Sequence, residues 1–290
     1  MNTKHKVIFG NCMSMEELPD SLCHLMVTSP PYFNAPFDYD GFFRNYDSYL
    51  GMLEKFASET YRVLQDGRIA VLNIDDMLVN GVKYPITADA IKIFQNEGFR
   101  YRDKIIWKKP DGYLRISRRS GVLLKNPYPM YFYPDNLLES IIIFQKGKFN
   151  YYSISKEIRQ KSKIDTKEFQ DNGWYKTIWE ITNVLPGSKL EKGVAAFPDE
   201  LAYRLIKLFS YKGETILDPF LGSGTTMKVA KKLERNSVGF EIIRDLENVI
   251  RIKTDFENEV DNNIFQVIER GTGKYRFVTL DFIERKKNGN

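Results

Sequence analysis

The stretch that decides the fold of this chain is Asp218-Pro219-Phe220-Leu221-Gly222-Ser223-Gly224-Thr225-Thr226. It follows the apolar run Thr215 to Leu217, which predicts a buried strand, and it opens Thr225 to Leu233, which predicts a helix. Glycines let the backbone approach a ligand closely, and the free amides of a helix start favour an anionic group. A plain strand-to-helix turn fits the same spacing, so the glycines alone leave both interpretations open.

Two acidic residues near this turn favour the ligand-binding interpretation. Asp218 would offer a carboxylate to a cationic amino group. Glu241 ends the next predicted strand, Ser237 to Glu241, and is placed to accept hydrogen bonds from two ribose hydroxyls. A ligand that carries both adenosine and an amino-acid end would satisfy the two carboxylates.

Outward from this turn, short apolar runs alternate with segments of helical spacing. This alternation predicts the α/β class, with a doubly wound, mainly parallel, Rossmann-like sheet covered by helices. The predicted strands lie at 7–9, 25–27, 68–73, 101–107, 139–144, 215–217 and 237–241, and the predicted helices at 14–18, 46–64, 85–96, 198–209 and 225–233.

Three segments break the alternation. Residues 110–134 are rich in Gly, Pro, Arg and aromatic residues and are predicted as a loop. Residues 147–176 are polar and basic, which indicates a module inserted outside the sheet. Residues 263–285 resemble a terminal hairpin that turns at Gly271-Thr272-Gly273, and the chain contains no internal repeat.

A second motif, Thr28-Ser29-Pro30-Pro31-Tyr32, stands at the end of another predicted strand. Ligands of open α/β sheets bind at such strand ends. Two prolines remove two backbone donors, which leaves a stiff rim rich in acceptors. Acceptors that hold both N–H groups of an aromatic amine would favour its pyramidal, nucleophilic form in the transition state. Without the first motif, this segment would be read as an ordinary proline turn.

Together the two motifs resemble those of the amino-methylating DNA methyltransferases. That family's catalytic motif reads Asp/Asn/Ser-Pro-Pro-Tyr, and its cofactor loop reads Asp-Pro-Phe-x-Gly-Ser-Gly-Thr-Thr; both are present here in full. The catalytic motif precedes the cofactor motif, as in the permuted β group. Gly10-Asn11-Cys12, Phe197-Pro198 and Trp107-Lys108-Lys109-Pro110 resemble lesser family elements near the adenine, the methionine end and the flipped base.

The resemblance implies S-adenosyl-L-methionine as cofactor, duplex DNA as substrate, and a base flipped onto Tyr32. No metal is implied. The residues that it assigns to catalysis are Ser29, Pro30, Pro31 and Tyr32, and those that it assigns to the cofactor are Asn11, Thr28, Phe197, Asp218, Phe220, Gly222, Ser223, Gly224, Thr225 and Glu241.

The chain departs from the family pattern at two places. Asn11 stands where the family usually has Asp, although its amide oxygen can still accept from the adenine amino group. Gly193-Val194-Ala195 replaces a usual His-Pro-Ala, which leaves one cofactor contact unassigned. Ser29 goes mostly with cytosine in this family, so the resemblance implies methylation at cytosine N4; adenine N6 is the alternative. Cytosine C5 methylation needs a thiolate, and neither Cys12 nor Cys23 stands in a Pro-Cys pair.

The motifs divide the chain into a catalytic half (1–147, with a DNA-facing loop at 111–135), a target-recognition insert (148–177), a cofactor half (178–250) and a C-terminal extension (251–290). Arginine can read guanine edges, whereas lysine mostly contacts phosphate. For any single residue, a solvated basic surface is an equally good interpretation. The residues expected to bind DNA are Arg115, Arg118, Arg119, Lys125, Lys156, Arg159, Lys161 and Lys163.

Composition sets wide limits. The net charge of +5 over 290 residues permits a polyanionic partner. Two cysteines and two histidines support neither a disulfide framework nor a zinc site. No run is apolar enough for a membrane span or a signal peptide, so a cytoplasmic enzyme is expected. A companion restriction endonuclease and the oligomeric state stay open, as do an inactive DNA-binding relative and a methyltransferase acting on RNA or a protein glutamine.

Overall fold

The computed structural model describes residues 2–35, 41–110, 120–132, 134–182, 197–256 and 263–270. Within these residues, one large sheet contains six adjacent parallel strands followed by the antiparallel β7 and then by β6 and β8, which run with the first six. In spatial order the strands are β11 (Ile264–Glu269), β1 (Lys4–Phe9), β10 (Asn236–Glu241), β9 (Thr215–Asp218), β2 (Cys23–Thr28), β3 (Leu64–Ile74), β7 (Leu138–Gln145), β6 (Arg100–Lys108) and β8 (Ile178–Glu180).

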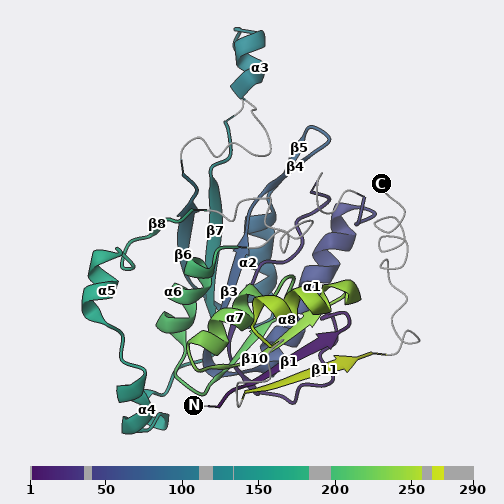
Figure 1. Ribbon diagram of the computed structural model, residues 1–290. Coiled ribbons are helices and arrows are strands. Elements are labelled where there is room, and N and C mark those ends of the chain that lie inside the picture. The colour runs from purple at the N-terminus through teal and green to yellow at the C-terminus, as the bar shows by residue number, and fades with distance from the viewer. Residues whose placement is uncertain are drawn as a thin grey trace.

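Helices cover both faces of this sheet (Figure 1). On one face lie α1 (Tyr46–Val63) and α2 (Ile86–Asn96), and on the other lie α6 (Asp199–Phe209), α7 (Thr225–Lys232) and α8 (Glu247–Lys253). The expected doubly wound, mainly parallel sheet is confirmed.

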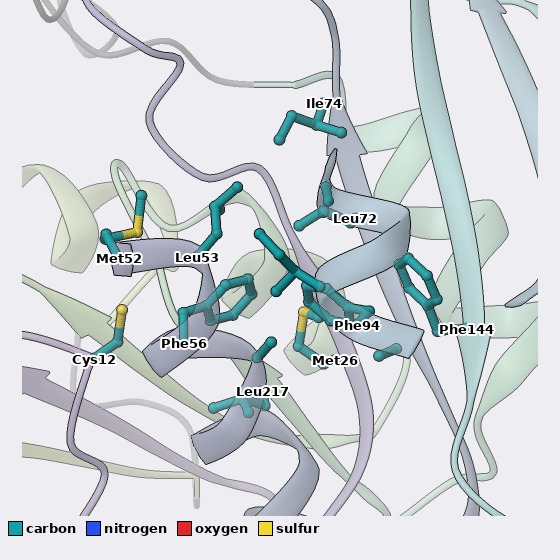
Figure 2. Packing of buried hydrophobic residues seen from close by; sticks show 14 of the residues in the cluster. Cys12, Met26, Met52, Leu53, Phe56, Leu72, Ile74, Phe94, Phe144 and Leu217 are labelled. Carbon is teal, nitrogen blue, oxygen red and sulfur yellow. The ribbon is translucent and has the colours of Figure 1, made fainter. Parts of the chain in front are cut away.

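The larger core cluster fills the space between the sheet and the helices α1 and α2. Figure 2 shows Leu53 and Phe56 of α1 and Phe94 of α2 packed over side chains that rise from the strands. The rings of Phe94 and Phe144 stack with centroids 4.5 Å apart, and both are fully buried. The apolar residues of α1 recur at helical spacing, and Asn45 caps its first turn, so local sequence and packing favour the same helix.

Two sequence predictions were wrong in detail. Residues 14–18 form turns rather than a short helix, because α1 supplies their hydrogen-bond partners: Arg62 donates to the carbonyls of Met15 and Leu18 at 2.9 Å. The predicted loop 110–134 contains the helix α3 (Ser120–Lys125). The small hairpin formed by β4 (Met77–Val79) and β5 (Val82–Tyr84) was not predicted at all.

The insert 148–177 stays outside the sheet, as expected. It forms a short 3₁₀ turn, η1 (Tyr151–Ser153), and the helices α4 (Lys156–Lys161) and α5 (Thr166–Asp171). Its first part packs at the amino-terminal ends of the strands, since Ser162 accepts from the Lys212 amide at 2.9 Å just before β9 begins. Figure 1 shows α4 and α3 at opposite ends of the molecule.

The C-terminal extension contributes part of the sheet. β11 pairs in parallel with β1 along all six of its residues, so the first arm of the predicted terminal hairpin is a strand with a different partner. The proposed turn at 271–273 lies outside the described residues. A further 3₁₀ turn, η2 (Arg244–Leu246), precedes α8. In the part of the chain that the structure describes, no helix is long and apolar enough to cross a membrane.

Candidate active site

The two sequence motifs meet at the point where the strand order reverses. β2 and β9 are neighbours, and the chain leaves β2 toward β3 but leaves β9 toward β10. Such a reversal opens a binding position at the carboxyl ends of the strands. There the Thr28 hydroxyl donates to Asp218 Oδ1 at 2.6 Å. The proline turn and the glycine turn therefore face each other, as the sequence predicted.

The glycine turn adopts the backbone conformation that its composition requires. Gly222 and Gly224 have φ values of 55° and 92°, in the left-handed region that favours glycine. From behind the turn, Lys253 of α8 donates to the hydroxyls of Ser223 and Thr225 at 2.7 Å each. Those two hydroxyls therefore already have a hydrogen-bond partner within the protein.

Asp218 and Glu241 are buried acids with shifted pKa values. Burial raises the pKa of Asp218 to about 6, against the hydrogen bonds from Thr28 and the Phe220 amide. Burial also raises the pKa of Glu241 to about 7, although the amides of Gly222, Ile242 and Ile243 donate to it at 2.8 Å. A cationic amino group at Asp218 would compensate its buried charge. Glu241 Oε1 already accepts from two amides and Oε2 from one, so Oε2 keeps a lone-pair direction for a ribose hydroxyl.

The Gly10-Asn11 segment lies beside Glu241 and is held from the C-terminal side. The Gly10 amide donates to the Glu241 carbonyl at 2.8 Å. Arg270, which follows β11, donates to the Asn11 carbonyl at 2.7 Å, and the Asn11 side chain accepts from the Met13 amide at 2.9 Å. Sequence reasoning did not find Arg270, since nothing local in the sequence links it to residue 11.

Two aromatic residues assigned to the cofactor occupy different surroundings. Phe197 is buried in the cluster beneath α6 and lies just before Pro198, the N-cap of that helix. The Phe220 ring is half-buried and meets the Phe56 ring edge-on at 5.2 Å. Both lie on elements that flank the strand-order reversal, which is compatible with the expected role.

The proline turn at 28–32 connects to a polar network that sequence reasoning missed. The Tyr32 hydroxyl donates to Glu139 Oε2 at 2.9 Å, and Asn73 Nδ2 donates to the same oxygen at 2.7 Å and to Ser29 Oγ at 3.5 Å. Lys109 Nζ lies 2.5 Å from Glu139 Oε1. Asn73 is the last residue but one of β3, Glu139 is the second residue of β7 and Lys109 follows β6, so three strands bring these residues to one edge of the sheet. The sequence did offer one signal for this network, because Asn73 and Glu139 are polar residues near the ends of otherwise apolar strands.

Burial and nearby charge hold the Tyr32 phenol in its protonated form. Burial raises its pKa well above the usual value, the carboxylates of Glu139 and Asp75 raise it further, and a hydrogen bond from the Ser29 hydroxyl lowers it. The neighbouring Trp107 is buried and donates its ring N–H to the Ile181 carbonyl at 2.8 Å, so its ring belongs to the core.

The structure separates the expected DNA-binding residues. Arg115, Arg118 and Arg119 lie outside the described residues. Lys125 is exposed at the end of α3, beyond the edge that holds Ser29. The remaining four lie on or beside α4, at the opposite edge of the sheet: Lys156, Arg159, Lys161 and Lys163.

Two of the basic residues on α4 already have partners within the insert. Arg159 lies 4.4 Å from the centroid of the Tyr151 ring, and Lys161 pairs with Glu157 at 2.6 Å. Because α4 lies at the opposite edge of the sheet, the structure does not bring these four basic residues close to the proline turn at 28–32.

Neither cysteine can supply a thiolate at this site. Burial raises the pKa of Cys23 to about 12 and that of Cys12 further still. A mechanism that begins with a cysteine nucleophile is thus excluded for these two side chains.

The sheet, the acidic glycine turn and the adjoining proline turn define a class: α/β enzymes that hold a nucleoside-bearing ligand at a strand-order reversal, next to an acceptor-rich turn. Residues 23–251 match the DNA methylase family N6_N4_Mtase. The chain is 35% identical to the type II methyltransferase M.MjaI of Methanocaldococcus jannaschii, over 93% of this chain and 98% of that one. It is 32% identical to M.MthZI of Methanothermobacter thermautotrophicus, over 100% of this chain and 85% of that one.

A solved structure has the same fold. TTHA0409 of Thermus thermophilus, crystallised with S-adenosyl-L-methionine, aligns with a TM-score of 0.72 and 26% identity, over 92% of this chain and 99% of that one. The chain belongs to the N6/N4 family of DNA methylases.

Proposed function

We propose that this enzyme transfers a methyl group from S-adenosyl-L-methionine to N4 of a cytosine in duplex DNA, within the cytoplasm and as part of a restriction-modification system. S-adenosyl-L-methionine is the cofactor expected from the sequence, and the family match and the TTHA0409 complex support it. The observation that carries the proposal is the 2.6 Å hydrogen bond from Thr28 to Asp218, because it joins the acceptor-rich turn to the cofactor turn.

The residues present fit this cofactor. Asp218 would accept from its cationic amino group, and Glu241 would accept from its ribose hydroxyls, so that two buried carboxylates gain donors. The bound cofactor supplies a methyl group on a sulfonium. The protein orients the amine toward this methyl group and excludes water, so that most of the rate enhancement comes from positioning the two reactants.

The target base has to flip out of the duplex because its amine must reach the proline turn. An exocyclic amine inside a stacked duplex cannot reach the turn at 28–32, so the base has to leave the stack. Tyr32 offers a half-buried ring fixed through its hydroxyl, and the Pro30 carbonyl with Ser29 Oγ offers two acceptors for the amine. We propose cytosine rather than adenine because Ser29 is the first residue of the Ser-Pro-Pro-Tyr motif. This choice of base rests on the resemblance to the family, in which serine at that position goes mostly with cytosine.

DNA would approach the edge of the sheet that carries Ser29. The helix α3 lies beyond that end of the sheet (Figure 1), so we propose that Lys125, at the end of α3, contacts the duplex together with Arg115, Arg118 and Arg119. The basic residues of α4 could take part only through a second surface, because they lie at the opposite edge.

The decisive experiment is methylome sequencing of a host that expresses the chain, followed by nucleoside mass analysis of its DNA. The expected product is N4-methylcytosine at one short site. N6-methyladenine would replace the proposed base with the alternative. Cofactor binding without transfer to any DNA would favour the inactive relative and refute the proposal.

A further inference from the structure

Glu139 stands out among the buried charges because it connects to the catalytic turn. Its side chain is 13% exposed and accepts from Tyr32, Asn73 and Lys109. A neutral serine hydroxyl cannot by itself keep the proton that a methylated amine must lose. The motif provides no carboxylate at position 29, whereas β7 brings one to the Tyr32 hydroxyl at 2.9 Å.

We propose that Glu139 is the terminal acceptor of a proton relay that runs from the target amine through the hydroxyls of Ser29 and Tyr32. The relay rests on the proposed function. A carboxylate can only accept, so the Tyr32 proton points to Glu139, and a Tyr32 lone pair accepts the hydrogen bond from the Ser29 hydroxyl. Ser29 then presents its own lone pairs to the amine. Glu139 is a positioning residue, since it acts through Tyr32 and Ser29.

The proton and charge balance closes. The amine lone pair forms the new N–C bond, the S–C bond breaks, and its electron pair stays on sulfur. The surplus proton on nitrogen moves to Ser29, the Ser29 proton moves to Tyr32, and the Tyr32 proton moves to Glu139. Both hydroxyls are restored, the sulfonium charge is gone and Glu139 is neutral. Its partial exposure gives the proton a way back to solvent.

Two observations speak against a purely structural role for this network. Lys109 and Glu139 form a nearly buried ion pair, with side chains 16% and 13% exposed, and such pairs are often no more stable than apolar replacements. Asn73 is buried, yet its Oδ1 has no hydrogen-bond partner among the described residues, which costs free energy. The amide nitrogen of Asn73 nevertheless stays on Glu139 and faces Ser29.

The test compares single-turnover methylation at saturating cofactor by the unsubstituted enzyme, Glu139→Gln, Tyr32→Phe and the double variant. The DNA is a duplex that contains the site found by methylome sequencing. Each single variant should lose on the order of 100-fold in rate, while affinities for cofactor and duplex stay unchanged. The double variant should lose no more than the poorer single variant, because both changes cut one relay.

Glu180→Gln is the matched control. Glu180 pairs with Lys108 at 3.1 Å on the neighbouring strand, but its side chain is 73% exposed, so this variant should keep the full rate. The relay is wrong if Glu139→Gln methylates at the control rate, if the two single losses multiply, or if the losses follow unfolding or weaker binding. No transfer by the unsubstituted enzyme would refute the proposed function itself, whereas activity lost only in the variants supports the relay.

Discussion

Replacing Asp218 by asparagine should stabilise the cofactor-free protein. The side chain is 3% exposed, and its pKa is raised from 3.8 to about 6. At pH 7.5 this shift means that the ionised carboxylate destabilises the fold by about 3 kcal/mol, at about 1.4 kcal/mol for each pH unit. Asparagine has nearly the same shape and can accept from Thr28 and the Phe220 amide, so the free energy of unfolding should rise by up to ~3 kcal/mol.

The same substitution should weaken cofactor binding. An amide lacks the charge that a cationic amino group seeks, and a charge-assisted hydrogen bond contributes about 1.5–3 kcal/mol. The dissociation constant should therefore rise roughly 10- to 150-fold. A gain in stability with a loss of affinity is typical of a residue kept for binding.

Thermal unfolding with and without S-adenosyl-L-methionine, together with calorimetric titration, measures both effects. The melting temperature should rise by roughly 2–4 °C for each kcal/mol. The sign follows from linkage: a raised acid pKa favours the fold below the unfolded value of 3.8, and this contribution is lost as pH rises through about 6. The difference between the two proteins should accordingly shrink as pH falls from 7.5 toward 4.

Glu214→Gln is the control for this experiment. Glu214 is also a buried acid, but it pairs with Arg68 at 2.5 Å at the other edge of the sheet. Its replacement should destabilise the protein by about 3–5 kcal/mol and leave cofactor affinity unchanged. An Asp218→Asn variant that is less stable without cofactor and still binds it with full affinity would show that Asp218 serves the fold and not the cofactor.

Three further predictions concern binding. Cofactor affinity should fall up to about tenfold for each pH unit below the apo pKa of Glu241, which is about 7, because ribose hydroxyls need the ionised acceptor; a flat calorimetric profile from pH 8 to 6 would contradict that role. Lys125→Gln should lower the slope of log affinity against log salt by about one, whereas Lys161→Gln should leave it unchanged, and equal slopes would remove the proposed orientation of the duplex. Arg270→Gln should weaken cofactor binding through the released Gly10-Asn11 segment, detectable by titration; full affinity would show that this support is dispensable.

The meeting of the two motifs was predictable because each follows a buried strand, and ligands of doubly wound sheets bind at the carboxyl ends of strands. The polar network was not. Asn73, Lys109 and Glu139 lie far apart in the sequence, and Glu139 meets the other two only because β7 runs antiparallel between β3 and β6. No local pattern encodes that pairing.

Side-chain competition and long-range packing explain the other differences. Residues 14–18 have helix-compatible spacing, yet Arg62 from a distant helix binds their carbonyls, so tertiary contacts override local preference. The basic character of the insert was visible in the sequence, but its location was not, since that depends on Ser162 meeting Lys212 across fifty residues.

The placement of β1 has a consequence for how the enzyme is made. Residues 4–9 leave the ribosome long before their partner β10, which is synthesised more than two hundred residues later. Contacts between such distant segments form slowly, and an unpaired strand edge invites misassembly in the meantime. The Gly10–Glu241 hydrogen bond beside the glycine turn thus cannot form before residue 241 has been synthesised, so a nascent chain joins these two segments only after β10 is in place.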